Sequence, residues 1–153
     1  MMEQVFSPPL PVAELPTLLP HRPPMVWVDR VAAINERGGV TIVDVTKSKS
    51  ALYFSEGAIA PHMQIEWIAQ SYGFTRAAHL MCGFLGADEL PTNCFLIQIQ
   101  KADFLAPVPK DGAVTVKVEC TRSVGAVSFL SGQVFNDRAE KICQASIKIY
   151  AGD

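Results

Sequence analysis

The sequence predicts an α+β fold in which one long apolar helix is wrapped by an antiparallel sheet. Two observations predict it. Residues 61–85 carry the end signals of a single helix and are apolar on nearly every side, so another layer must enclose them. The later segments alternate apolar and polar residues, which is typical of strands with one buried and one solvent-facing side.

The helix is predicted over residues 61–85 from its two ends. Pro61 suits the first helical position, Gly86 suits the residue after the last turn, and no β-branched run interrupts the segment. Its apolar residues leave no clear polar face, which indicates a helix enclosed within the protein. They are Ile65, Trp67, Ile68, Ala69, Phe74, Ala77, Ala78, Leu80 and Met81.

Strands are predicted on both sides of this helix. Residues 25–34 and 40–47 are rich in Val and Ile and flank a glycine-containing turn, so they predict a hairpin after a short helical turn at residues 12–19. In the second half of the chain, valines at 114, 116 and 118 alternate with polar residues. Four strands are predicted there, at residues 94–104, 113–124, 126–136 and 141–150.

Length and composition predict one domain over residues 1–153. A chain of 153 residues with 49% hydrophobic content can bury a sizeable core. The formal net charge is -2 and the basic residues are scattered, so no nucleic-acid partner is expected. Polar residues interrupt the apolar stretch at 58–87, and the N-terminal residues include an acid and several prolines. We therefore expect a cytoplasmic protein with no membrane partner.

No cofactor or metal is implied by the sequence. The four cysteines form no C-x-x-C pair and have no nearby His that would complete a zinc site. A G-x-S-x-G elbow, a P-loop, a Rossmann fingerprint and an H-E-x-x-H motif are also missing from the sequence. Hydrolases, nucleotide-binding proteins and metalloproteases of those types therefore lack their signatures here.

Glu66 is the first candidate catalytic residue, because it lies about one turn into an apolar helix. Burial raises the pKa of such a carboxyl and the helix dipole lowers it, and a carboxyl held near neutrality suits proton transfer. Gln70, four residues later on the same face, is placed to hold the carboxyl by a hydrogen bond. The simpler interpretation is an acid that only complements the helix dipole.

Two histidines are candidate partners of Glu66 in acid–base chemistry. His62 stands four residues before Glu66, on the same helix face, although a histidine in the first turn can equally be a solvent-facing or capping residue. His21 lies in a proline-framed loop that can aim a side chain or cap the next strand. The first-turn N–H groups of Met63 and Gln64, which lack intrahelical partners, are candidates to polarise a thioester carbonyl.

Three segments resemble the β-hydroxyacyl-[acyl-carrier-protein] dehydratase family. LLPHRPPM at residues 18–25, followed by VDRV at 28–31, resembles its N-terminal signature. IEWIAQS at residues 65–71 is similar to the start of its central helix, and KADF at 101–104 with PVPKDG at 107–112 is similar to its segment entering a late strand. The resemblance thus extends over nearly the whole chain.

The resemblance implies a hotdog fold, in which dimers form edge to edge and share the acyl site. In this family a His removes the α-proton and the helix carboxyl, at the position of Glu66, protonates the departing hydroxyl. The acyl chain enters a tunnel lined partly by the proline-His loop, which implies that Pro20 and His21 contact it. The substrate would be an acyl carrier protein thioester.

One segment departs from the family pattern. The family's catalytic His lies in a Gly-His-Phe-Pro-Gly segment before the helix, but here FSEG at residues 54–57 runs directly into AIAP at 58–61, so that His is absent. This shortened pattern resembles a divergent subgroup of dehydratases of aryl polyene and related polyketide-type pathways. Chains of that subgroup are expected to work beside a second dehydratase-like subunit.

Three functions follow from these observations. The first is a 3-hydroxyacyl-[acyl-carrier-protein] dehydratase with Glu66 as acid and His21 or His62 as base, acting across the interface of a homodimer or heterodimer. The second is a non-catalytic, acyl-carrier-binding partner subunit that relies on another chain for the base. The third is a thioesterase, because the same fold supports hydrolysis and fold alone does not decide the chemistry.

Overall fold

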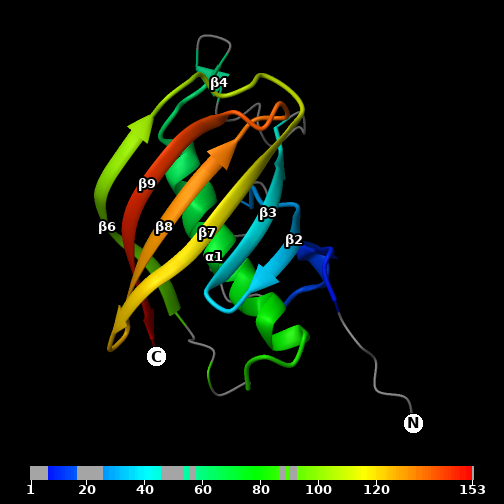
Figure 1. Ribbon diagram of the computed structural model, residues 1–153, viewed down its shortest axis with the longest axis vertical. Helices are drawn as coiled ribbons and strands as arrows, with labels where there is room; N and C mark the ends of the chain where they lie inside the picture. The colour runs from blue at the N-terminus through cyan, green and yellow to red at the C-terminus, as the bar shows by residue number, and fades with distance from the viewer. Residues whose placement is uncertain are drawn as a thin grey trace.

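The computed structural model describes residues 7–16, 26–45, 54–55, 58–86, 89 and 93–152, leaving aside the side chains of residues 54, 55 and 58. One helix, α1 (Met63–Met81), packs against a seven-stranded antiparallel sheet with the order β1-β2-β3-β7-β8-β9-β6 (Figure 1). The predicted α+β architecture is confirmed. The strand bounds are Leu10–Pro11 (β1), Arg30–Asn35 (β2), Gly38–Asp44 (β3), Asn93–Phe104 (β6), Ala113–Val124 (β7), Val127–Phe135 (β8) and Lys141–Gly152 (β9).

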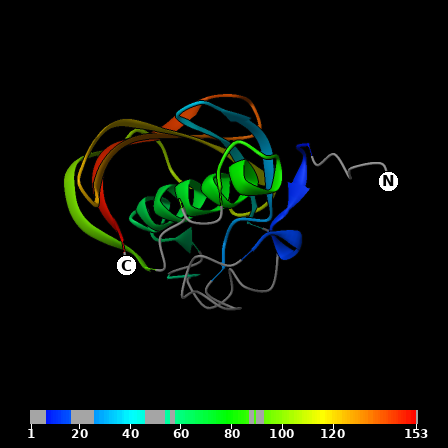
Figure 2. The same ribbon diagram turned by 90° about the horizontal axis from the view of Figure 1, so that it is seen from below.

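The sheet curls around α1, which lies inside the curve (Figure 2). Register irregularities occur in the long strands, between Cys120 and Arg122 in β7 and between Ile99 and Lys101 in β6. Such bulges increase the local twist and bend a strand. The helix is consequently well covered, and Ile68 has no exposed surface. No helix in the described part of the chain combines the length and apolar character needed to cross a membrane.

Alternation along the strands sets the contact between sheet and helix. In β7, Val114, Val116 and Val118 are buried between more exposed polar residues, as predicted. In β8, Gly132 lies where Ile68 of α1 meets the sheet, and a Cβ atom at Gly132 would lie 2.8 Å from the Ile68 Cδ1 atom. The missing side chain at this position therefore lets the helix approach the sheet closely.

The helix is shorter than predicted at both ends. Residues 61 and 62 form a turn, and α1 begins after them. At the other end, the N–H of Gly83 donates to the Leu80 carbonyl at 3.1 Å. The N–H of Phe84 donates to the His79 carbonyl at 2.8 Å. These bonds, with Gly83 at a φ of 81°, form a Schellman motif. The prediction that Gly86 ends the helix is wrong, because the left-handed Gly83 already stops it.

The strands keep to the predicted ranges and differ mainly at their ends. β7 has the predicted bounds, β6 begins one residue earlier, β8 is one residue shorter at each end and β9 runs two residues further. β2 begins at Arg30, later than the predicted start at residue 25, which lies outside the described residues. The predicted end of β3, at residues 46–47, also lies outside them. The predicted turn at residues 12–19 is a 3-10 turn at Val12–Glu14, and residues 17–19 are not described. The sequence did not predict β1 or the two-stranded pair β4 (Phe54–Ser55) and β5 (Ala58–Ile59).

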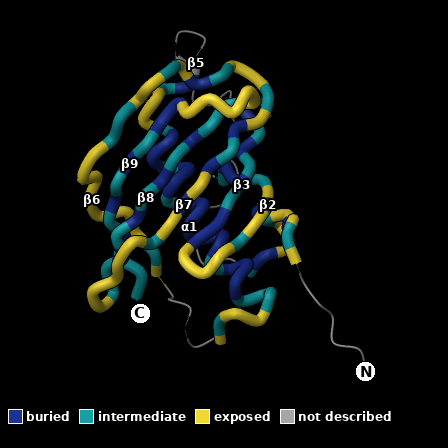
Figure 3. The backbone as a smooth tube through the Cα atoms, viewed as in Figure 1, coloured by how far each residue is buried: buried dark blue, intermediate teal, exposed yellow. Residues whose placement is uncertain are grey.

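β6 forms one edge of the sheet, and β9 is its partner among the described strands. Most of its residues are exposed (Figure 3). Phe95, Ile97 and Ile99 expose 51, 51 and 50% of their surface, and Leu96 exposes 38%. We call these four residues the β6 edge cluster. An apolar sheet edge of this kind marks an interaction surface, because its backbone groups and its side chains are both open to another strand.

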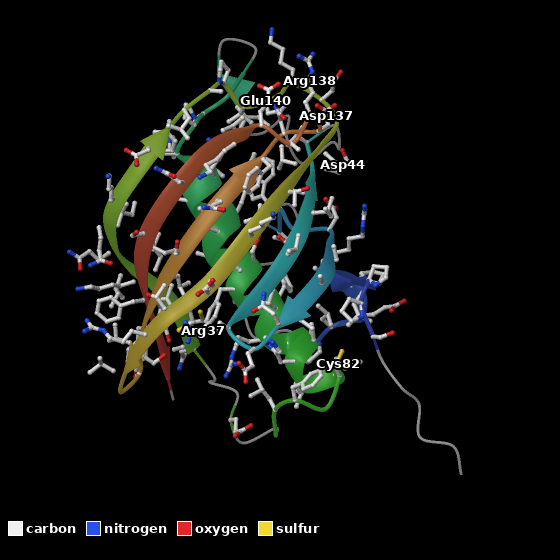
Figure 4. All side chains as sticks on the ribbon, in the orientation of Figure 1. Arg37, Asp44, Cys82, Asp137, Arg138 and Glu140 are labelled. Carbon is white, nitrogen blue, oxygen red and sulfur yellow. The ribbon has the colours of Figure 1, made fainter. Side chains whose placement is uncertain are left out.

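Labelled charged side chains lie at both ends of the sheet in Figure 4. Asp137, Arg138 and Glu140, from the β8–β9 turn, lie at the same end as Asp44, whereas Arg37 lies at the opposite end. Arg37 Nη1 is 3.6 Å from the Oε1 atom of Glu119, and both side chains are mostly exposed. Exposed ion pairs of this kind contribute little to stability, so the buried contacts between α1 and the sheet dominate the fold.

Candidate functional site

Two hydrogen bonds in series fix the Glu66 carboxylate near the start of α1. The Nε2 atom of Gln70 donates to the Oε1 atom of Glu66 at 2.8 Å. The Oε1 atom of Gln70 accepts from the main-chain N–H of Trp27 at 2.9 Å. The predicted bond between Glu66 and Gln70 is therefore present, and the buried Gln70 is itself held by the segment before β2.

Glu66 is half-buried, so the expectation of a carboxyl in a dry apolar shell is only partly met. Its sequence neighbours Ile65 and Trp67 are buried, with 3 and 0% of their surface exposed. Successive residues of a helix point in different directions, so these neighbours do not enclose the carboxylate. A carboxyl held by a buried amide and partly open at the surface can reach a substrate and exchange a proton with it.

His62 lies one turn before Glu66, at the N-cap of α1. It is exposed, and its side chain makes no capping hydrogen bond. Its backbone already has helical angles, with φ -66° and ψ -16°, so the four-residue spacing directs His62 and Glu66 toward the same side. The role of His62 as a base stays a prediction.

The N–H groups of Met63 and Gln64 in the first turn of α1 donate to carbonyls that lie outside the helix. The N–H of Met63 donates to the Ala60 carbonyl at 3.1 Å, and the N–H of Gln64 donates to the Pro61 carbonyl at 3.2 Å. The Gln64 side chain is buried, and its Nε2 atom also donates to Pro61, at 3.1 Å. These N–H groups thus lack acceptors within α1, as expected, and the turn before the helix supplies the carbonyls instead. Substrate binding by Met63 and Gln64 stays a prediction, and it requires a substrate that competes with these carbonyls.

His21 and Pro20 lie outside the residues that the structure describes, so their roles stay predictions. The described chain resumes at residue 26, and Trp27 follows with its side chain fully buried. Its ring packs on Trp67 of α1, with ring centroids 5.4 Å apart. Trp27 is thereby anchored beside the first turns of α1, which carry Glu66.

Two titratable groups that the sequence analysis did not single out as functional are Tyr72 of α1 and Cys94 of β6. Burial raises the pKa of Cys94 to about 11, and the negative charge of Glu66 adds to this effect. Burial also raises the pKa of Tyr72 to about 12, and the interaction with Cys120 adds to this effect. Within the described ranges, no three His, Cys, Asp or Glu side chains are grouped so as to hold a metal ion. Tyr72 was visible as a polar residue in an apolar helix, whereas the position of Cys94 depends on the curl of β6.

We expect the free energy of unfolding to fall as the pH rises above about 10. Tyr72 keeps its proton up to a pKa of about 12 when folded, while the unfolded side chain ionises near 10.0. The folded state therefore binds more protons in this window, and its stability falls as the pH rises. Urea unfolding between pH 9 and 12 should show a decline that is shallower in Tyr72→Phe, by on the order of 2 kcal/mol at the upper end. Equal slopes in both proteins would contradict this assignment.

Comparison with known proteins identifies the family. The ApeP-like family model, described as ApeP dehydratase, matches residues 13–153. The 3-hydroxyacyl-[acyl-carrier-protein] dehydratase FabZ of Actinobacillus pleuropneumoniae serotype 5b is 30% identical over 140 residues, covering 89% of this chain and 87% of the relative. FabZ of Aliivibrio fischeri is 29% identical over 143 residues, covering 91% of each chain.

Solved structures share the architecture. The dehydratase heterocomplex ApeI:P from Xenorhabdus doucetiae aligns with a TM-score of 0.77 at 16% identity, covering 94% of this chain and 92% of that chain. The PaaI protein of E. coli, from the phenylacetic acid degradation operon, aligns with a TM-score of 0.60 at 10% identity, covering 82 and 80%. These likenesses confirm the hotdog fold, and the FabZ relatives support the predicted dehydratase function. With the family match extending from residue 13 to the last residue, this chain belongs to the ApeP-like dehydratases.

Proposed function

We propose that this chain takes part in the dehydration of 3-hydroxyacyl thioesters on an acyl carrier protein, with Glu66 as the acid. The observation that carries the proposal is the half-buried carboxylate of Glu66, held by Gln70 near the start of the central helix. The FabZ relatives are 3-hydroxyacyl-[acyl-carrier-protein] dehydratases, which supports this substrate class. Residues 1–153 act as one unit in this proposal.

The reaction removes one water from the acyl group. A base takes a proton from C2, the C–H electron pair forms the C2–C3 double bond, and the C3–O bond breaks. Glu66 gives its proton to the departing hydroxyl, which leaves as water, and the thioester remains intact. Glu66 ends as a carboxylate and the base ends protonated, so the proton must return to Glu66 before the next turnover. A positioned acid of this kind accelerates proton transfer by about 10²- to 10⁴-fold.

The base in this proposal is His62 or His21, acting on a substrate held at the interface with a second subunit. His62 is exposed at the same end of α1 as Glu66. It can therefore reach a substrate only at the surface of this chain, and a second subunit is needed to cover that surface. His21 precedes Trp27 in the sequence, and Trp27 contacts Trp67 and Gln70 in the first turns of α1, near Glu66.

The second subunit binds along β6 in this proposal. The β6 edge cluster leaves large apolar side chains exposed on a strand that has an open edge among the described elements. Pairing with an edge strand of another dehydratase-like subunit would bury these side chains and satisfy the open backbone groups. The ApeI:P heterocomplex of Xenorhabdus doucetiae, which shares the fold, supports a heterodimer as one form of this assembly.

Intact-carrier mass spectrometry tests the proposal. The purified chain is incubated with a 3-hydroxyacyl carrier-protein thioester, alone and with a second dehydratase-like subunit, and the carrier is weighed. We expect the loss of one water with the thioester intact. Dehydration only in the mixture would favour the partner-subunit function, while release of free carrier thiol would show a thioesterase. An unchanged carrier in both incubations would contradict the proposed function.

A further inference from the structure

A polar pocket lies between the middle of α1 and the strands that curl over it. Its volume is about 130 Å³, which suits the end of a chain rather than a whole substrate. Part of its wall is the backbone of Gly73, which leaves room because it carries no side chain. The pocket is lined by Tyr72, Gly73 and Arg76 of α1, Glu89, Cys94 of β6, Ser123 of β7, Ser128 of β8 and Ala151 of β9.

Hydroxyl groups form a connected network in this pocket. The Oγ atoms of Ser123 and Ser128 are 3.2 Å apart, and the Sγ atom of Cys120 is 3.4 Å from Ser123 Oγ. The Tyr72 hydroxyl also lies in this pocket, where Cys120 and Ser128 influence its pKa. Tyr72 and Ser128 are 7 and 8% exposed, whereas Ser123 is exposed, so only the hydroxyls of Tyr72 and Ser128 are shielded from solvent. Each hydroxyl donates one hydrogen bond and accepts two, which leaves acceptor capacity for a ligand hydroxyl.

The pocket lies along the helix face that carries Glu66. Glu66, Ala69 and Gly73 are spaced by three and four residues, so they share one side of α1. Seven residues of helix span about 10 Å, which is the reach of a medium-length acyl chain. Cys94 links the two places, because it lines the pocket and lies within the electrostatic reach of the Glu66 carboxylate.

We infer that this pocket receives the far end of the acyl group and selects acyl groups that end in a hydroxyl over those that end in a methyl group. The inference rests on the proposed function, since it places the reacting end at Glu66. A methyl end would displace water from Tyr72 and Ser128 without replacing its hydrogen bonds, and buried polar groups left in that state are costly. A site built around hydroxyls therefore discriminates against an analogue that lacks one.

A carboxylate end fits this pocket less well than a hydroxyl. Arg76 offers a positive charge at the lining, but the Glu89 carboxylate lies on the same lining. Glu89 accepts a hydrogen bond from the N–H of Gly86 at 2.7 Å, which holds it in place. A second carboxylate would be repelled by it, whereas a neutral hydroxyl is not.

Binding of two matched probes to the full chain tests the inference. Each is a pantetheine analogue with an amide in place of the thioester and a 3-hydroxydecanoyl chain, and one of them carries a second hydroxyl on the terminal carbon. Calorimetry should give a Kd about tenfold lower for the probe with the terminal hydroxyl. In the Tyr72→Phe/Ser128→Ala double variant, we expect this preference to fall below about twofold.

A control variant and a third probe complete the test. Ser131→Ala changes a serine on the same strand as Ser128 but on the opposite face of the sheet, and it should keep the preference. Equal binding of the two probes by the wild-type chain would overturn the inference and leave the proposed function standing, because acyl binding would be shown. Tighter binding of a probe ending in a carboxylate would also overturn it. If neither probe binds, both the inference and the acyl binding in the proposed function fail.

Discussion

Replacing Glu66 with glutamine should lower the rate of dehydration by about 10²- to 10⁴-fold, because the amide is too weak an acid to protonate the departing hydroxyl. The fold should persist, since a glutamine side-chain oxygen can still accept the hydrogen bond from Gln70 that the carboxylate accepts at 2.8 Å. We therefore expect a change of less than about 1 kcal/mol in the free energy of unfolding. Single-turnover rates, measured by mass of the intact carrier, report the first effect and urea unfolding reports the second.

The matched control is Glu140→Gln. Glu140 is exposed in the β8–β9 turn, and the turn uses its backbone N–H rather than its carboxylate, so the same chemical change should leave the rate unaltered. Both variants and the wild-type chain are compared under the condition in which the wild type turns over, with or without the second subunit. A Glu66→Gln variant that keeps the wild-type rate would show that Glu66 is not the acid.

The second large effect is expected on stability, from Trp67→Ala. Trp67 has no exposed surface and packs on Trp27, with the rings 5.4 Å apart and tilted by 52°. Truncating a fully buried aromatic side chain removes its contacts and leaves a cavity, which typically costs about 3–5 kcal/mol. The loss should appear as a lower midpoint of urea unfolding with an unchanged slope.

Phe84→Ala and Trp67→Phe are the controls for this prediction. Phe84 exposes 70% of its surface, so its truncation should change stability by no more than about 0.5 kcal/mol. Trp67→Phe keeps an aromatic ring against Trp27 and should fall between the wild type and Trp67→Ala. A Trp67→Ala chain as stable as the Phe84→Ala chain would show that the contact between the two tryptophans is not needed for the fold.

Local patterns in the sequence predicted the parts of the fold that depend on neighbouring residues. β7 was predicted with its correct bounds because its first half alternates between buried and more exposed residues and a glycine, Gly125, follows its last residue. The pairs β1–β2 and β4–β5 were not predicted, because strands of two residues are too short to show alternation. The helix end was predicted at Gly86 instead of Gly83, since two glycines three residues apart both suit the end of a helix and only the backbone angles distinguish them.

The candidate site was predictable where it lies within one helix. Glu66 and Gln70 are four residues apart, so helical spacing predicted their hydrogen bond. The third member, the N–H of Trp27, is separated from Gln70 by 43 residues and depends on how the segment before β2 packs against α1. The hydroxyl groups that line the pocket at Tyr72 likewise come from one helix and two strands, and no spacing along the chain indicates that they meet.

The bond from Trp27 to Gln70 also couples the packing of the segment before β2 to the orientation of Glu66. Because the Gln70 Oε1 atom accepts a hydrogen bond from a main-chain donor, its amide group is oriented so that the nitrogen faces Glu66. A shift of the main chain at Trp27 would therefore be transmitted to the Glu66 carboxylate through a single side chain.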